Sequence, residues 1–191
     1  MVSMYLDQEL VRKILDGNEQ AFTMLVKKYE RLVYFLVYRI IGEEELTKDV
    51  CQEVFVKVYL KLSDFNFKSK LSTWIATIAY RHALNQVKKD KGNRFGEEIN
   101  PDQDYQEYIS VGPDRMLEET ELKDQVHKLI DQLPHQYKTV LTLFHLNEFN
   151  YKEIYEITGW PEGTVKNYLF RARKLLKDVI TSNVKNQILE K

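Results

Sequence analysis

Five basic side chains and no acidic one lie between residues 164 and 177 of this 191-residue chain. On a helical wheel, at about 100° per residue, this stretch separates one apolar stripe from an opposite face of cationic and amide side chains. Such a face can bond phosphates and base edges in the major groove of DNA. Its members are Lys166, Asn167, Phe170, Arg171 and Lys174. A surface helix with solvated lysines is the alternative interpretation.

A second cationic segment lies earlier in the chain, where residues 66–91 hold six basic side chains against one acidic one. The rings of Phe65, Phe67 and Trp74 are interleaved with these cations. Aromatic rings stack on unpaired bases while cations bond the backbone, so the segment suits single-stranded nucleic acid. A tryptophan at helical spacing more often belongs to a core, and the same alternative holds for both phenylalanines.

Other kinds of chemistry have no support in the sequence. The four histidines, His82, His127, His135 and His145, show no metal-ligand spacing. The chain has no glycine-rich phosphate loop and no Gly-x-Ser-x-Gly elbow. The three acidic residues at 43–45 lie at an expected helix start, where they favour the helix dipole without a catalytic role. A single cysteine, Cys51, excludes an internal disulfide and a cysteine-based zinc site. We therefore expect no enzyme, no cofactor and no metal.

The elements that position the first cationic face read as a short helix, a tight turn and a longer helix. Asn150 followed by Glu153 is a capping pattern that starts the short helix. Gly159 supplies its stop, and Pro161 suits the first turn of the next helix. The apolar stripe that anchors the longer helix is Val165, Leu169, Ala172 and Leu176. This combination predicts a helix-turn-helix.

The second cationic segment follows a bundle pattern of apolar residues three and four apart. The helices expected before and within it cover residues 5–16, 19–41, 43–62 and 71–91. In the last of these, Leu71, Ile75, Ile78, Ala79 and Ala83 make the buried side, and Trp74, Thr77, Arg81, Asn85 and Lys88 form a separate stripe. Further helices are expected at 116–133 and 135–146, the latter burying Val140, Leu143 and Phe144.

The fold class expected from these patterns is all-α, with two small helical domains. Residues 1–92 form the first domain and 116–181 the second, while 93–115 is a flexible linker and 182–191 a fraying tail. Formal charge is +3 over 1–92, −6 over 93–120 and +2 over 121–191. This basic, acidic, basic order fits two binding modules joined by a tether that nucleic acid repels.

Bulk composition agrees with a soluble, foldable chain, since 43% of the residues are hydrophobic and 30% are charged. A net charge of −1 argues against general nucleic-acid binding by the whole molecule. No stretch reaches the length of a membrane span, and the N-terminus lacks a secretion signal. We expect a cytoplasmic protein.

Four segments in order, at 49–59, 70–79, 133–140 and 161–173, give the chain a family resemblance. It resembles the bacterial sigma factors of the extracytoplasmic-function (ECF) group, the smallest members of the sigma-70 family. The resemblance covers about residues 19–178. It implies a protein that directs core RNA polymerase to specific promoters and helps to open the DNA. Its implied partners are core polymerase, promoter DNA and an anti-sigma factor.

The resemblance also implies roles for particular residues. Core polymerase would be bound by Asp49, Gln52, Glu53, Lys57 and Tyr59. The opened minus-ten element would be held by Phe65, Phe67, Lys68, Lys70, Thr73, Trp74, Arg81, Asn85, Lys88, Lys89 and Lys91. In the minus-thirty-five element, Lys166, Asn167, Phe170 and Arg171 would face bases, and Thr164, Arg173 and Lys174 would bond phosphates.

The chain departs from the family pattern at two positions. Tyr155 stands where helix-turn-helix sequences usually carry alanine, and Arg81 replaces an asparagine that is common among relatives. Two other functions are open alternatives: a conventional regulator that binds an operator, and an adaptor that reuses the fold. An operator-binding regulator has no need for a single-strand site, so residues 65–91 separate it from a sigma factor.

Overall fold

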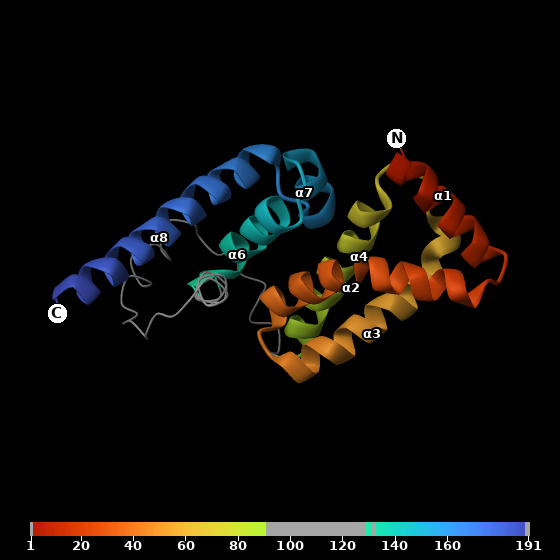
Figure 1. Ribbon diagram of the computed structural model, residues 1–191, viewed down its shortest axis with the longest axis horizontal. Helices are drawn as coiled ribbons and strands as arrows, with labels where there is room; N and C mark the ends of the chain where they lie inside the picture. The colour runs from red at the N-terminus through yellow and green to blue at the C-terminus, as the bar shows by residue number, and fades with distance from the viewer. Residues whose placement is uncertain (1, 91–128, 131–132, 190–191) are drawn as a thin grey trace.

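The computed structural model describes residues 2–90, 129–130 and 133–189, and every regular element in them is helical (Figure 1). The elements are α1 (Val2–Leu15), α2 (Glu19–Ile41), α3 (Glu44–Lys61), the 3₁₀ turn η1 (Leu62–Asp64), α4 (Leu71–Asp90), α6 (His135–Leu141), the π-helical turn η3 (Thr142–Leu146), α7 (Tyr151–Thr158) and α8 (Glu162–Leu189). The all-α class is confirmed. We call α1 to α4 the N-terminal group and α6 to α8 the C-terminal group.

Helix α2 begins and ends at the residues that the sequence indicates. The Asn18 side chain accepts a hydrogen bond from the Ala21 N–H at 3.0 Å, which satisfies one free donor of the first turn. At the other end Gly42 adopts φ 79°, a left-handed conformation that glycine enters without steric cost. Its N–H then bonds the Tyr38 carbonyl at 2.8 Å and closes the helix.

The N-terminal group packs through the apolar stripes of its helices. On α3 the buried residues Val50, Val54 and Val58 are each one turn apart, and α2 and α4 pack against this helix. Helix α1 is held on α2 by Asp7, which forms an ion pair with Lys28 and accepts a bond from the Tyr29 hydroxyl at 3.1 Å. Helices α2 and α3 therefore each bury one face, as the three-and-four spacing predicts.

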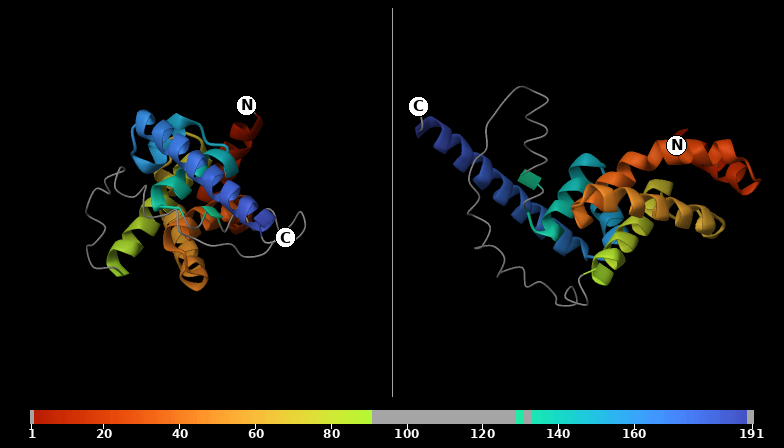
Figure 2. Two further views of the ribbon diagram at one scale, coloured as in Figure 1. Left: turned by 90° about the vertical axis from the view of Figure 1, so that its left-hand side faces the viewer. Right: turned by 90° about the horizontal axis from the view of Figure 1, so that it is seen from below.

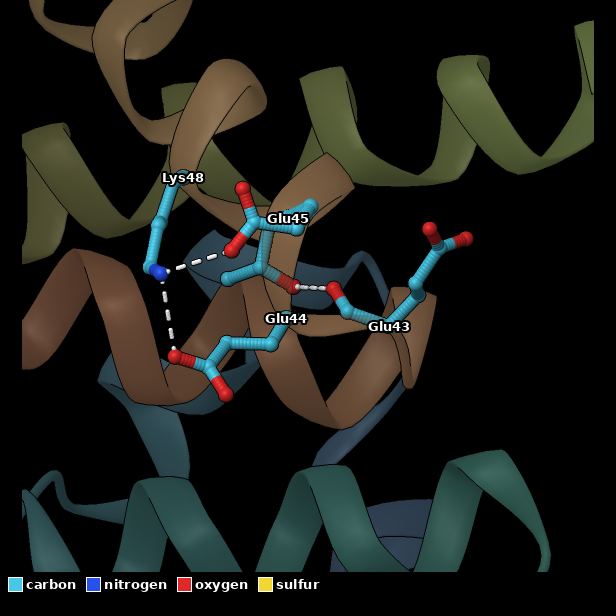
Figure 3. A network of polar contacts seen from close by, with 5 residues as sticks. Glu43, Glu44, Glu45 and Lys48 are labelled. Carbon is cyan, nitrogen blue, oxygen red and sulfur yellow. Dashed lines mark hydrogen bonds and ion pairs between the residues drawn. The ribbon is translucent and has the colours of Figure 1, made fainter.

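The acidic start of α3 is a local structural feature, shown in Figure 3. The Lys48 ammonium lies 3.0 Å from Glu44 and 2.8 Å from Glu45, one turn back on the same helix. The Thr47 hydroxyl donates to the Glu43 carbonyl at 2.6 Å. Acids in a first helical turn complement the helix dipole, and Lys48 offsets their mutual repulsion, which accounts for these residues without a catalytic duty.

The C-terminal group differs from the expected pattern in one helix. Residues 135–146 were expected to form one regular helix, yet after α6 the chain widens into η3, where the Asn147 N–H bonds the Thr142 carbonyl at 3.1 Å. Val140 and Leu143 are buried as expected, whereas Phe144 is only partly buried. The widened turn rotates the side chains that follow it, so the prediction of a buried Phe144 is corrected.

The two groups lie against one another and share one hydrophobic core. Helix α7 packs on α4, and α6 packs on α2 (Figures 1 and 2).

Helix α8 continues to Leu189, past residue 181, where the sequence suggested a tail, and extends away from the body of the molecule. The linker expected at 93–115 lies outside the described residues, as does most of the helix expected at 116–133. In the described part of the chain, no helix combines the length and apolarity needed to cross a bilayer.

Candidate nucleic-acid interface

Helices α7 and α8 form the helix-turn-helix that the sequence indicates. The Asn150 side chain accepts the Glu153 N–H at 3.0 Å, and the Glu153 carboxylate accepts the Asn150 N–H at 2.9 Å, which completes the predicted capping box. Gly159 ends α7 at φ 81°. The Trp160 N–H then donates to the Thr158 hydroxyl at 3.1 Å and fixes the turn into α8.

Tyr155, the residue in place of the usual alanine, lies on the outer side of α7. Its side chain is 49% exposed, whereas its neighbour Ile154 is fully buried. The tyrosine ring therefore leaves the approach of α7 to α8 unobstructed. The helix crossing depends on Ile154 and Ile157 instead, which both lie in the core.

Helix α8 is buried on one face and exposed on the other. Val165, Leu169 and Ala172 have at most 1% of their surface exposed, and Leu175 is buried in place of the expected Leu176, which is partly buried. The exposed residues of the opposite face are Lys166, Asn167, Phe170, Arg173 and Lys174, while Thr164 and Arg171 are half-buried. Phe170 is 68% exposed, so its ring lies in solvent beside these polar and cationic side chains.

Aromatic rings from η3 and α7 support the cations of α8. The Arg173 guanidinium lies 5.4 Å from the Phe144 ring centre, and the Lys166 ammonium lies 5.3 Å from that of Tyr151. The Phe144 and Tyr151 rings are themselves stacked, with centres 5.2 Å apart. Sequence reasoning missed this platform, because its two rings come from separate elements that no periodicity connects.

His145 completes the support of Arg173. The Arg173 Nε–H donates to His145 Nε2 at 3.2 Å. Loss of hydration, with the Arg173 charge as a smaller cause, lowers the pKa of His145 from its usual 6.5. The ring is therefore neutral at pH 7 and can accept this bond, which leaves the terminal nitrogens of Arg173 for an anion.

The loop before α4 gathers three aromatic rings. Phe65 is buried, with its ring centre 4.7 Å from Phe67 and 5.2 Å from Trp74. Phe67 is 37% exposed and adopts φ 59°, a left-handed conformation that is strained for a bulky residue. Such strain persists only where the surroundings enforce it and is common at binding sites. Trp74 is partly buried, so the cluster presents Phe67 and part of Trp74 to solvent.

Helix α4 carries an exposed cationic stripe beside this cluster. Arg81, Asn85, Lys88 and Lys89 are exposed, as are Lys68 and Lys70 in the loop. Thr77 is half-buried, and its hydroxyl donates to the Thr73 carbonyl at 2.8 Å. Thr73 lies apart from the stripe, because it is 1% exposed and faces the core. Lys91 lies outside the described residues.

The outer face of α3 presents all five residues that the resemblance assigns to a protein partner. Asp49, Gln52, Glu53, Lys57 and Tyr59 are exposed. Two of them also have contacts within the group: Glu53 bonds His82 at 2.6 Å, and the Tyr59 ring packs edge-on against Phe22 at 5.0 Å. Val56 and Leu60, which sequence reasoning missed, are 58% and 71% exposed one turn apart on the same helix.

Each of the two groups of helices matches a known protein family. The family described as Sigma-70 region 2 matches residues 25–92, and the family described as Sigma-70, region 4 matches residues 123–176. These two matches cover the two cationic surfaces in separate parts of the chain.

Comparisons with whole proteins give the same result. The ECF RNA polymerase sigma-E factor of Haemophilus influenzae is 32% identical over 188 residues, covering 94% of this chain and 98% of the relative. The RNA polymerase sigma-H factor of Pseudomonas aeruginosa is 31% identical over 183 residues, covering 92% of this chain and 94% of the relative. The ECF RNA polymerase sigma factor SigW of Bacillus subtilis is 30% identical over 173 residues, with 87% and 92% covered.

Solved structures share the fold at lower sequence identity. CnrH, in complex with the cytosolic domain of CnrY, aligns with a TM-score of 0.65 at 18% identity, over 93% of this chain and 98% of that one. The sigma factor RpoE from Bartonella quintana, in complex with the anti-sigma factor NepR, aligns with a TM-score of 0.63 at 19% identity, over 84% and 96%. The chain therefore belongs to the extracytoplasmic-function group of the sigma-70 family, the RNA polymerase sigma factors that direct core polymerase to promoters and help to open the DNA.

Proposed function

We propose that this sigma factor reads its promoter with two separate surfaces, one for intact duplex and one for the opened strand. Residues 116–181 would bind the minus-thirty-five element and residues 1–92 the minus-ten element, with 93–115 as linker and 182–191 as tail. The observation that carries this proposal is the pair of exposed cationic and aromatic surfaces on α8 and α4, which lie in different groups of helices.

The duplex surface is the exposed face of α8. Lys166, Asn167, Phe170 and Arg171 would face base edges in the major groove, and Thr164, Arg173 and Lys174 would bond phosphates. The contacts of Arg173 support its role, since Phe144 and His145 hold the guanidinium in one orientation. A fixed guanidinium loses less conformational entropy when it binds a phosphate than a freely moving one.

The single-strand surface is the aromatic cluster together with the exposed stripe of α4. An unpaired base would stack on Phe67 and Trp74, while Arg81 and Asn85 would contact the strand beside it. Cations at both ends would bond phosphates: Lys68 and Lys70 in the loop, and Lys88, Lys89 and Lys91 at the end of the helix. Phe65 supports this cluster from the core. Thr73 is buried, so it would contact DNA only if the residues that cover it moved.

Opening of the promoter by such surfaces is a binding process. A protein that holds the separated strand more tightly than the duplex shifts the equilibrium toward the open state. The stacking of a flipped base offsets an unpairing cost of about a few kcal/mol. No covalent step is required of this chain, so we infer that it is not an enzyme and uses no cofactor.

The outer face of α3 would dock on core RNA polymerase. Its charged and polar residues Asp49, Gln52, Glu53, Lys57 and Tyr59 surround the exposed side chains of Val56 and Leu60. An apolar centre with a polar rim is the usual anatomy of a protein–protein interface. We also infer an anti-sigma partner, since the structural relative RpoE is bound to the anti-sigma factor NepR. The inferred location is the cytoplasm, where polymerase would be bound.

Reconstituted transcription tests the proposal. The full chain is mixed with sigma-free core polymerase on a supercoiled genomic library, and initiation at discrete sites is the expected result. Asp49→Lys and Glu53→Lys should each impair initiation and co-purification with polymerase, whereas Glu30→Lys, on the exposed side of α2, should retain both. Specific footprints without polymerase, with no initiation in its presence, would identify an operator-binding regulator instead.

A further inference from the structure

One polar ring lies within the buried stripe of α4. Leu71, Ile75 and Ala79 follow one another at a spacing of four along this helix, and each is at most 2% exposed. His82 comes three residues later and is 8% exposed. An imidazole in such a place loses its hydration, so it is tolerated where a protein group replaces the hydrogen bonds that water made.

The group that replaces water is the carboxylate of Glu53, on the outer face of α3. Its Oε2 atom lies 2.6 Å from Nε2 of His82. Because an ionised carboxylate can only accept, Nε2 of His82 carries the proton and donates it. The His82 side chain is 9% exposed, whereas that of Glu53 is 58% exposed. The bond therefore joins a buried ring of α4 to an exposed carboxylate of α3.

This bond restrains an acidic side chain in the middle of the docking face. Asp49 and Lys57 lie one turn before and one turn after Glu53 on α3, and both are exposed. A free glutamate samples several rotamers and loses that freedom when it enters an interface. The bond to His82 imposes the order beforehand. It engages one of the two carboxylate oxygens, so Oε1 can accept a hydrogen bond from a cationic group of the partner.

Stability alone is a poor explanation for this bond. An apolar side chain at position 82 would continue the stripe of Leu71, Ile75 and Ala79 and would need no partner. Replacing a buried polar pair by apolar groups of similar shape is often neutral for stability. A bond with one exposed partner also contributes little to the free energy of unfolding. Orientation of Glu53 toward a second molecule is a role that only a donor at position 82 can serve.

We propose that His82 is a positioning residue for the docking of this chain on core RNA polymerase. It acts through Glu53, which it restrains on the outer face of α3 with one oxygen left for the partner. The inference rests on the docking face proposed above and adds to it a residue that is buried in another helix. Because Glu53 is ordered in the free chain, less conformational entropy is lost on binding.

The affinity of the full chain for core polymerase tests this role. The chain carries a fluorescent label at its N-terminus and is titrated with sigma-free core enzyme. His82→Leu fills the buried site without a donor and should weaken binding by roughly threefold to tenfold, the effect of releasing one restrained side chain. His82→Gln retains an N–H donor of similar reach and should recover most of the affinity. Val87→Ala, a buried change five residues further along α4, should lower the free energy of unfolding and leave the affinity unaltered.

A double-mutant cycle shows whether the effect of His82 passes through Glu53. In a Glu53→Ala background, His82→Leu should weaken binding by less than about twofold, since no carboxylate is left to position. In an Asp49→Ala background, one turn away on the same helix, the full effect of His82→Leu should persist. Chemical denaturation of each variant shows that the compared chains are folded.

The results distinguish a failure of this proposal from a failure of the docking face. If Glu53→Ala and Asp49→Ala weaken binding but His82→Leu does not, the positioning role is overturned and the docking face stands. The same conclusion follows if His82→Gln binds as weakly as His82→Leu, or if the losses from His82→Leu and Glu53→Ala add in full. Wild-type affinity in both Glu53→Ala and Asp49→Ala overturns the docking face and the positioning role together.

Discussion

The two cationic surfaces of this molecule are built in different ways. On α8 Phe170 and most of the cations are exposed on a single helix face, Arg171 is half-buried, and only the opposite stripe is in the core. In the segment from Phe65 to Lys89, candidates are divided: Arg81 and Asn85 are exposed, whereas Phe65 and Thr73 are buried. Duplex DNA offers a groove that a protruding helix can enter, while an unpaired base needs rings arranged around it. The difference follows from the form of the nucleic acid that each surface would bind.

The largest expected effect is on the free energy of unfolding, and it distinguishes the buried face of α8 from its exposed face. Leu169→Ala removes a side chain that is 1% exposed and leaves a cavity, so unfolding should become easier by about 2–5 kcal/mol. Phe170→Ala, at the next position, should change stability by less than about 0.5 kcal/mol, because its ring is in solvent. Chemical denaturation of both variants measures this contrast, and equal losses would show that the assignment of faces is wrong.

Base reading by α8 is tested by Arg171→Ala. If the guanidinium bonds a guanine with two nitrogens, its removal should relax promoter selectivity by about 1–3 kcal/mol. Competition between promoter variants in reconstituted transcription gives this number. Lys177→Ala, on the same helix beyond the proposed surface, is the matched control. An unaltered preference in Arg171→Ala removes this residue from the base-reading set.

Strand capture by the other surface is tested by Phe67→Ala. Loss of one stacking ring should weaken open-complex formation by about 1–3 kcal/mol, without weakening the contact with the minus-thirty-five duplex. Permanganate reactivity of unpaired thymines measures opening, and protection of the upstream duplex measures the other contact. If both signals fall together, the two surfaces are not independent. A premelted template should restore much of the lost activity.

The boundary between the groups should respond to acid through His135. Burial, with the Lys138 charge as a smaller cause, lowers the pKa of His135 to about 4 from 6.5. Between these values the unfolded chain binds more protons than the native one, so stability rises with pH across this window. Acidification from pH 7 to 5.5 should cost about 1 kcal/mol through this residue. His135→Phe, which keeps a ring beside Tyr80, should show a correspondingly shallower pH dependence of unfolding.

The smallest effect is expected at Tyr155. Because this side chain lies outside the contact between α7 and α8, Tyr155→Ala should change the free energy of unfolding by less than about 0.5 kcal/mol and leave promoter choice unaltered. A large loss of selectivity would mean that the tyrosine sets the helix crossing after all.

Periodicity and capping chemistry predicted most of the helices because their causes are local. The Asn150–Glu153 capping box, the left-handed glycines 42 and 159, and the valine stripe of α3 all act over three or four residues. The π-helical turn at η3 was missed, since a widened turn depends on how the surrounding helices pack. The platform of Phe144 and Tyr151 beneath the α8 cations, and the bond of His145 with Arg173, were missed for the same reason.

The resemblance of four ordered segments indicated the family, and the sequence by itself determined the all-α class, the helix-turn-helix and the two cationic segments. Those features depend on residue types at fixed short spacings, which a helix converts directly into faces. Only the tertiary structure decided which candidates are accessible. Thr73 and Tyr80 are buried, Tyr80 stacks on His135, and Lys70 pairs with Glu153. The two contacts join residues about 50 to 85 positions apart. Contacts at such separations depend on how whole groups of helices pack, and no local pattern records that.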